Sequence, residues 1–449
     1  GIRQSGTLGQ VIKKLLPQGK TTVFKAQLRI LPSVAFISAF LNNTPVVVIF
    51  APIIKHWAKS VNLPATKFLI PLSYVTILGG ICTLIGTSTN LVVHGMILEA
   101  GFEGFSMFEL GKVGIFIAIA GIIYIFLFSK RLLPDARPDT AVPDEEVEEG
   151  EKLHRVEAIL GARFPGINKK LKDFNFQRHY GAEVKEIKTR NGQRFVSNLE
   201  DVVLHEGDTL VVMADDTFIP TWGESSVFVL LTNGNEPDTT GKKKRWFALL
   251  LLVLMIVGAT VGELPVTKEM FPDIKLDMFF FVSITTIIMA WTNLFPARKY
   301  TKYISWDILI TIACAFAISK AMVNSGVADS VAKFIIGLSD DYGPHVLLAM
   351  LFIITNLFTE LITNNAAAAL AFPLALSIAS QLGVSPTPFF VVICMAASAS
   401  FSTPIGYQTN LIVQGIGNYK FTDFVRIGLP LNIITFLISI ILIPLIWNF

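Results

Sequence analysis

The sequence of 449 residues has little charge and few cysteines. Only 16% of its residues are Asp, Glu, Lys or Arg, which is well below the share of a soluble globular protein. Its three cysteines, at positions 82, 314 and 394, all lie inside apolar segments, which excludes both a disulfide framework and a zinc cluster. No nucleophile–base pair and no phosphate-cradling loop is present, so we expect neither an enzyme nor a nucleic-acid partner.

Apolar sequence, by contrast, is abundant. Hydrophobic residues make up 52% of the chain, and its mean hydropathy is +0.58. Runs long enough to cross about 30 Å of hydrocarbon occur at 68–98, 108–132, 246–263, 277–295, 305–323, 387–417 and 425–447. We therefore expect an α-helical polytopic membrane protein, embedded in a plasma or inner membrane.

The charges between these runs predict the orientation of the protein. Basic residues cluster after every second run, at 55–67, 130–137, 242–245 and 298–302, whereas the alternate loops are acidic. Because positively charged loops stay in the cytoplasm, the basic loops are expected on the cytoplasmic side.

Two polar segments repeat one another in the two halves of the chain. LNNTPVVVIFAP (41–52) corresponds to ITNNAAAALAFP (362–373), each with an Asn nine residues before a Pro. A Gly-x-x-x-Asn element follows in LIGTSTNLVVHG (84–95) and in PIGYQTNLIVQG (404–415), and the spacing between the asparagines is 47 and 46 residues. Polar, Gly-interrupted segments at corresponding places in two halves point to the binding site of a secondary transporter.

The stretches around the first elements, 31–54 and 345–376, are too short to cross the membrane fully twice. We interpret each as a re-entrant helical hairpin with its tip at the polar segment. Five crossings separate the hairpins, an odd number, so the repeats are expected to be inverted, as alternating access requires.

Because three apolar segments precede the second hairpin and only about 30 residues precede the first, we also expect that about 70 N-terminal residues are missing; natural asymmetry between the repeats is the alternative.

Non-helical backbone inside a bilayer is tolerated only where it is buried in protein or lines a wet cavity. Hard cations such as sodium need oxygen ligands, which Asn43, Thr44, Ser88, Asn90, Thr363, Asn364 and Asn410 can supply. Amide and hydroxyl groups also suit an oxyanion. No Arg or Lys lies within the polar segments, so co-bound cations and helix dipoles must offset the anion's charge. Alternatively, these side chains only cap or tie helices.

These motifs resemble the divalent-anion/sodium symporter family, whose members carry dicarboxylates or sulfate. The family's Ser-Asn-Thr triplets correspond to Asn42-Asn43-Thr44 and Thr363-Asn364-Asn365, and its Gly-Thr-Pro-Pro-Asn-like breaks to 86–90 and 406–410. The resemblance implies an elevator mechanism, co-transported sodium at two sites and a homodimer. It implies a substrate site at Asn42, Asn43, Thr44, Thr87, Thr363, Asn364, Asn365 and Tyr407, and sodium ligands at Asn43, Gly86, Ser88, Asn90, Asn364, Gly406, Thr409 and Asn410.

The departures from this pattern bear on the substrate. Asn42 and Asn365 replace hydroxyl residues, and Tyr407 replaces a Thr, which narrows the site and adds a phenolic donor. These changes favour a small tetrahedral oxyanion, sulfate, over a dicarboxylate. A dicarboxylate symporter and a non-transporting sulfate-sensing transceptor remain alternatives, and Glu360 could either tune a cation site or brace its hairpin arm.

A small α/β domain is expected between the membrane halves. Residues 134–150 are acidic and Pro-rich, which is typical of a linker, and short strand-like runs follow at 156–160, 184–188, 209–213 and 227–231. The stretches 170–176, 179–184 and 204–212 resemble the TrkA-C domain of potassium-channel regulators, in the manner of the sulfate-transporter branch of the symporter family. The expected organisation is a first repeat (1–133), the linker (134–150), a cytoplasmic TrkA-C-like domain (151–233) and a second repeat (234–449).

Overall fold

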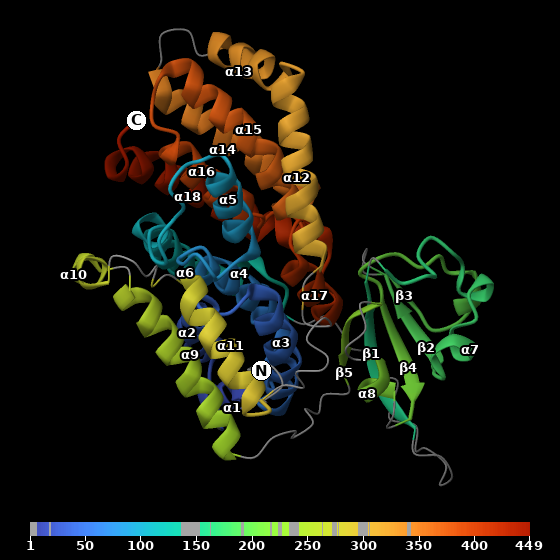
Figure 1. The fold of residues 1–449 in the computed structure, drawn as a ribbon. Coiled ribbons are helices and arrows are strands. Elements are labelled where there is room, and N and C mark those ends of the chain that lie inside the picture. Colours follow the sequence, from blue (N-terminus) through green and yellow to red (C-terminus); the bar gives the residue numbers. More distant parts are fainter. Residues whose placement is uncertain are drawn as a thin grey trace.

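The computed structural model describes residues 7–17, 19–135, 153–161, 163–189, 193–215, 218–222, 227–232, 242–262, 264–271, 276, 278–294, 304, 306–338 and 343–449. A helical body and a small sheet domain lie side by side (Figure 1). The predicted linker falls almost wholly outside the described residues, which resume at residue 153.

The helical body is built from two sets of helices. The first comprises α1 (Thr7–Leu15), α2 (Val23–Ser38), α3 (Asn43–Ser60), α4 (Leu69–Gly80), α5 (Ser88–Glu99) and α6 (Gly111–Leu132). The second comprises α9 (Lys242–Gly262), α10 (Pro265–Met270), α11 (Met278–Trp291), α12 (Trp306–Asn324), α13 (Val327–Leu338), α14 (Gly343–Leu361), α15 (Asn364–Leu382), α16 (Thr387–Ser398), α17 (Gln408–Gly417) and α18 (Phe421–Ile446).

The two predicted polar segments lie where one helix ends and the next begins. Asn42 is the N-cap of α3 and accepts a hydrogen bond from the Thr44 amide, while Thr363 caps α15 by accepting from the Ala366 amide. Such side chains replace the missing partners of the first-turn amides, which explains why each new helix starts there. Each polar segment therefore joins two helices, α2 to α3 and α14 to α15.

The centre of the helical body consists of α4 and α16. Every residue of α4 is buried, and so is every residue of α16 after Thr387. A helix that is buried all round must be apolar all round, which accounts for the near-continuous apolar runs in the sequence. Both helices stop short at a non-helical stretch before α5 and α17; we name residues 81–87 the first break and 399–407 the second break.

Within the described residues, α6, α14, α15 and α18 are long and apolar enough to cross a membrane, and α12 with α13, bent by 72°, would make a fifth span. The expectation that the stretch around the second polar segment is too short to cross twice is therefore wrong on length, because α14 and α15 have 19 residues each and the helical sequence continues to Leu382. The outer faces of α6 and α18 are apolar and exposed, for example at Phe116, Ile123, Ile433 and Ile441. Large apolar surfaces of this kind are expected where lipid, rather than water, is the solvent.

The sheet domain has its own core. Five antiparallel strands follow the order β3-β2-β4-β1-β5: β1 (His154–Leu160), β2 (Glu183–Lys188), β3 (Arg194–Phe195), β4 (Thr209–Ala214) and β5 (Phe228–Thr232). Short helices α7 (Phe176–Tyr180) and α8 (Phe218–Trp222) complete it, and aromatic side chains such as Phe164, Phe174 and Phe228 fill its interior. Four of the strands coincide with the predicted runs, whereas the two-residue β3 was missed.

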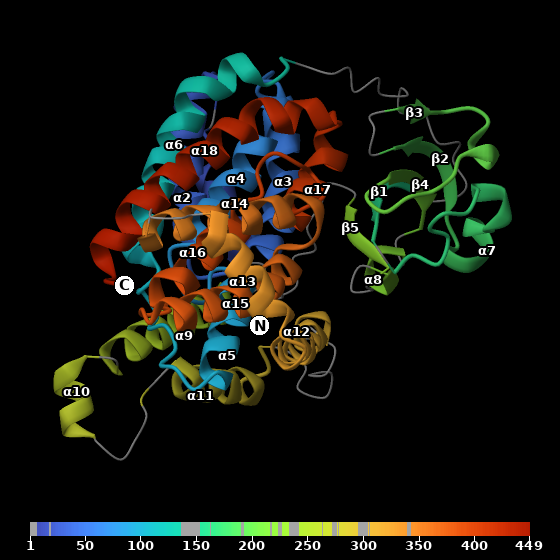
Figure 2. The ribbon, with the colours of Figure 1, turned by 90° about the horizontal axis from the view of Figure 1, so that it is seen from above.

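The sheet domain lies against α17 and near α3 in both views of the molecule (Figures 1 and 2). Ile159 of β1 is buried in the core of the helical body rather than in the core of its own domain. An ion pair of 3.4 Å also joins Lys55 of α3 to Glu157 of β1.

Candidate functional site

Four helices begin at the same place in the helical body: α3, α5, α15 and α17. Side chains at their first turns pair across the two halves. The Thr44 hydroxyl donates to Gln408 Oε1 (3.2 Å), and the Ser88 hydroxyl donates to Asn365 Oδ1 (3.3 Å). Because the N-terminus of a helix carries partial positive charge, this convergence favours a bound anion.

Tyr407 connects both halves at this point. Its hydroxyl lies 2.9 Å from Thr87 Oγ1 and 2.5 Å from the side-chain amide of Asn43, and Asn364 also hydrogen-bonds to it. Tyr407 precedes α17, Thr87 precedes α5, and the two asparagines open α3 and α15. A single phenolic oxygen thus contacts residues at the starts of the other three helices.

Asn43 is itself fully engaged with protein groups. When its amide oxygen accepts from the Tyr407 hydroxyl, its two N–H groups have three acceptors within reach, Ser38 Oγ (2.8 Å), Thr76 O (3.0 Å) and Gly86 O (3.2 Å), so both amide atoms are satisfied. This orientation is preferred because buried polar groups need partners. Asn43 therefore ties the α2–α3 connection to the first break, which places it behind the site rather than inside it.

A cavity of about 750 Å³ opens beside Tyr407. Six of the predicted substrate residues line it: Asn42, Thr44, Thr363, Asn364, Asn365 and Tyr407. The other two, Asn43 and Thr87, are buried and reach the cavity only through the Tyr407 hydroxyl. Among the described lining residues none is Lys or Arg, so amides, hydroxyls and helix ends are the groups available to an anion.

The predicted sodium ligands are divided between the cavity and the two breaks. Ser88, Asn364 and Gly406 line the cavity, whereas Asn90, Thr409 and Asn410 are fully buried in the first turns of α5 and α17. Gly86 and Gly406 are close-approach positions: a Cβ at Gly86 would lie 2.4 Å from Gly80 O, and one at Gly406 would lie 2.2 Å from Thr359 O. Only glycine fits such spacing.

Asn90 meets the requirement for a cation ligand best. Its Nδ2 donates to Thr83 O at 2.9 Å, while its Oδ1 is buried without a hydrogen-bond partner in the described part of the chain. The equivalent oxygen of Asn410 accepts from the Ser73 hydroxyl at 2.7 Å. A buried neutral oxygen without a donor is suited to a hard cation such as sodium. The donor set at the first break therefore fits sodium, and bound sodium would add positive charge to the site.

A profile of the citrate transporter family matches this sequence over residues 1–383 and, again, over 274–449. The chain belongs to the citrate transporter family. This membership agrees with the resemblance to anion/sodium symporters. It also agrees with the structure, in which helix N-termini converge on a cavity that has no Lys or Arg among its described lining residues.

Three relatives illustrate the range of this similarity. An uncharacterized transporter of Synechocystis sp. is 30% identical over 534 residues, which cover 100% of this chain and 87% of that protein. A Chlamydomonas reinhardtii protein named for the sulfur deprivation response is 28% identical, covering 98% of this chain and 90% of its own. Sodium/sulfate cotransporter 2 of the same alga is 31% identical over 62% of this chain and 31% of its own length.

In this family member, Glu360 braces the second break. Its carboxylate accepts from the Ser402 amide at 2.8 Å and from Asn432 Nδ2 at 2.7 Å. These hydrogen bonds anchor α14 to the break and to α18. Of the two roles that the sequence left open for Glu360, these partners agree with bracing the hairpin arm rather than with tuning a cation site.

Several lining residues were missed by the sequence analysis: Gln408, Gln414, Thr311 and Glu206. Gln408 and Gln414 had a signal, because they are polar positions in an otherwise apolar helix. Ser73, which bonds both Thr409 and Asn410, had the same kind of signal within α4. Glu206 had none, since it belongs to the sheet domain.

Proposed function

We propose that the protein is a sodium-coupled secondary active transporter of a small divalent oxyanion, sulfate. The observation that carries this proposal is the Tyr407 hydroxyl at the meeting point of four helix starts, beside a cavity lined by amides and hydroxyls. In this function, α2–α3 and α14–α15 are the re-entrant hairpins of two inverted repeats, and the protein works as an elevator within a homodimer.

Neutral donors and helix ends can hold an oxyanion, but they leave much of its double charge unbalanced. Sodium bound near Asn90 supplies positive charge close to the cavity when it is present. The Ser88 side chain joins the first turn of α5, directly after the first break, to Asn365 in the first turn of α15, so an ion beside the break also orders the wall of the cavity. Anion binding and sodium binding then strengthen each other, which is the basis of coupled transport.

The choice of sulfate rests on the shape and chemistry of the wall. Tyr407 occupies the position at which the family usually has a small hydroxyl residue, and its ring takes up space that a longer carboxylate would need. Relatives named as sodium/sulfate cotransporters support the same choice. The relative named as a Na(+)/citrate cotransporter keeps a carboxylate substrate as the alternative.

The test is uptake of radiolabelled sulfate into proteoliposomes that contain the full chain. An inward sodium gradient should drive accumulation, and potassium in place of sodium should abolish it. Unlabelled sulfate should compete strongly, and citrate or succinate weakly. Strong competition by citrate or succinate with little effect of sulfate would assign a carboxylate substrate instead.

A transceptor is the second candidate, because a relative that aligns over 98% of this chain is named for the sulfur deprivation response. In that case the purified chain would bind sulfate in the presence of sodium, yet liposomes would show no flux. Sodium-driven flux would reject this candidate.

A further inference from the structure

The sheet domain contributes a residue to the cavity of the helical body. The turn that leads into β4 contains Glu206 and Gly207, and Glu206 lines the cavity together with the first turns of α3, α15 and α17. Glu206 is exposed, which places its side chain at the cavity mouth rather than among the buried residues. A carboxylate therefore stands at the entrance of a cavity whose other described lining residues are uncharged.

The backbone of this turn lies directly on α17. Gly207 has a φ of +84°, and a Cβ added there would lie 2.6 Å from Leu411 Cδ1. One turn further along, a Cβ at Gly415 would lie 2.7 Å from Thr209 Oγ1 and 3.2 Å from Ile159 Cδ1. Leu411 and Gly415 are four residues apart, so they share one face of α17, and that face is covered by the sheet domain.

A second contact holds the sheet domain to α3. Lys55 of that helix pairs with Glu157 of β1 at 3.4 Å, and both side chains are about one-fifth exposed. The helices contacted, α3 and α17, are those whose first turns carry Thr44 and Gln408 at the cavity. The sheet domain thus contacts two helices that form walls of the cavity, and it also contributes Glu206 to the cavity lining.

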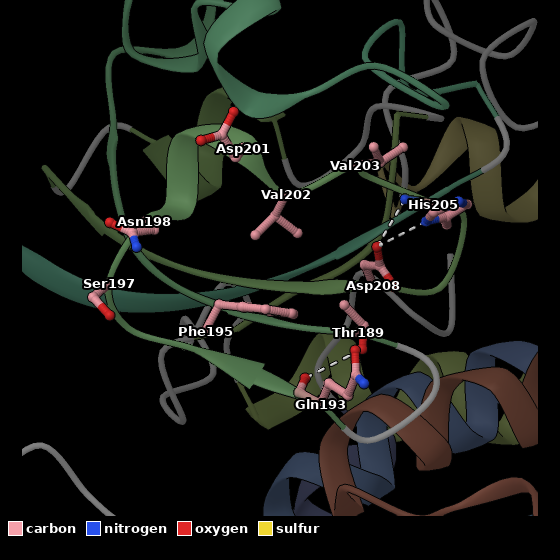
Figure 3. A pocket seen from close by; sticks show the side chains of 10 residues that line it. All are labelled: Thr189, Gln193, Phe195, Ser197, Asn198, Asp201, Val202, Val203, His205 and Asp208. Atoms are coloured by element: carbon pink, nitrogen blue, oxygen red, sulfur yellow. Dashed lines mark hydrogen bonds and ion pairs between the residues drawn. The ribbon is translucent and has the colours of Figure 1, made fainter.

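The same turn forms the edge of a separate cavity within the sheet domain. This cavity has a volume of about 700 Å³, and Figure 3 shows His205 and Asp208 at one end of it and Thr189 and Gln193 beside them. Asp208 is buried and accepts from the His205 amide at 2.7 Å, which closes the turn. A movement in the sheet domain would therefore be transmitted to Glu206.

We propose that the sheet domain is an autoinhibitory clamp on the cavity. In the docked state the 205–208 turn is seated on α17, Glu206 repels a divalent anion at the mouth, and α3 and α17 are held together. Substrate exchange requires the domain to undock. The inhibition part of this inference rests on the proposed transport function, because it is measured as flux. The docking part does not, because cross-linking measures it without transport.

The docking is tested with a Thr209→Cys, Gly415→Cys double variant of the full chain, reconstituted in liposomes and treated with a mild oxidant. Mass spectrometry should detect the disulfide-linked peptide pair in the double variant and in neither single variant. Absence of that disulfide would overturn the docked arrangement. Formation of the disulfide without any transport in any variant would contradict the proposed function and leave the docking standing.

The inhibition is tested by sodium-driven sulfate flux in the same liposomes. Oxidation of the double variant should reduce flux by about fivefold or more, and reductant should restore it. Glu206→Gln should raise the initial rate, whereas Glu200→Gln, an exposed carboxylate of the same domain that does not line the cavity, should leave it unchanged. An unchanged rate in the oxidised double variant, or a lower rate in Glu206→Gln, would overturn the clamp.

A matched pair of glycines separates undocking from damage to the domain. Gly207→Ala and Gly181→Ala both place a side chain at positive φ, but only the first meets α17, because nothing lies within 4 Å of a Cβ at Gly181. The clamp therefore predicts faster flux and weaker protection of α17 from hydrogen exchange in Gly207→Ala alone. Equal behaviour of the two variants would contradict it.

Discussion

Tyr407 is the residue on which the cavity depends most. Replacing it with Phe removes a hydroxyl that contacts Asn43, Thr87 and Asn364, and leaves the buried Asn43 and Thr87 side chains short of a partner. We expect the KM for sulfate to rise about tenfold, because the lost hydrogen bonds hold the wall of the cavity in shape. Initial rates of uptake over a range of sulfate concentrations measure this.

The control is Tyr124→Phe, since Tyr124 is also buried and its hydroxyl donates to Ile427 O at 3.0 Å, away from the cavity. It should lower stability slightly and leave the KM unchanged. Equal KM values for the Tyr407 variant and the unmodified chain would show that this hydroxyl does not belong to the site.

Asn90 offers a separate prediction about sodium. Asn90→Ala removes a buried oxygen without a described hydrogen-bond partner, so the sodium concentration needed to stabilise the protein should rise about tenfold. Asn90→Asp places a charge at the same position and should lower that concentration. Thermal unfolding of the purified chain over a series of sodium concentrations tests both predictions. If the unfolding temperatures of Asn90→Ala and Asn90→Asp depend on sodium concentration in the same way, Asn90 is not a sodium ligand.

At the scale of elements, the breaks require close backbone contact. Gly86→Ala would place a methyl group 2.4 Å from Gly80 O, and we expect a loss of about 1–3 kcal/mol of stability together with weaker transport. Gly95→Ala, in the middle of α5 with nothing within 4 Å, should be neutral or stabilising because Ala favours helix. Thermal unfolding compares the stability of the two variants. A similar loss of stability in both would show that the first break does not require close backbone contact at Gly86.

The helices themselves were largely predictable. The runs at 68–98, 108–132 and 387–417 coincide with α4–α5, α6 and α16–α17, because helices buried on all sides or facing lipid must be apolar. The polar segments were located correctly because N-caps have a distinct composition. In contrast, α1 and α13 were missed: α1 is short, and α13 lies beyond the apolar run that predicted α12.

Contacts between the halves were beyond prediction from one sequence. The repeat indicated that Asn43, Asn364 and the two Gly-x-x-x-Asn elements have matching roles, but not that Tyr407 of one half reaches Thr87 of the other. Nor did it indicate that Asn43 would be fully bonded to protein while Asn90 kept a buried oxygen without a described donor. Such differences arise from tertiary packing, which breaks the symmetry that the sequence suggests.

At the scale of the whole molecule, the position of the sheet domain is the least predictable feature. Its strands follow from alternating apolar residues, but nothing in the sequence of 205–208 indicates a contact with α17. That contact depends on two glycines. Gly207 lets the turn of the sheet domain approach the Leu411 side chain of α17, and Gly415 lets the α17 backbone approach the side chains of Thr209 and Ile159. The predicted homodimer and the predicted inversion of the repeats remain predictions.

The central claim is that sodium and a divalent oxyanion bind together where the four helix starts meet. Calorimetric titration of the purified full chain with sulfate, at low and at high sodium with choline balancing the ionic strength, tests it most directly. We predict that the sulfate Kd falls by about tenfold or more as sodium rises, and that Asn90→Ala removes most of this dependence. A sulfate Kd that is the same at both sodium concentrations would contradict the claim.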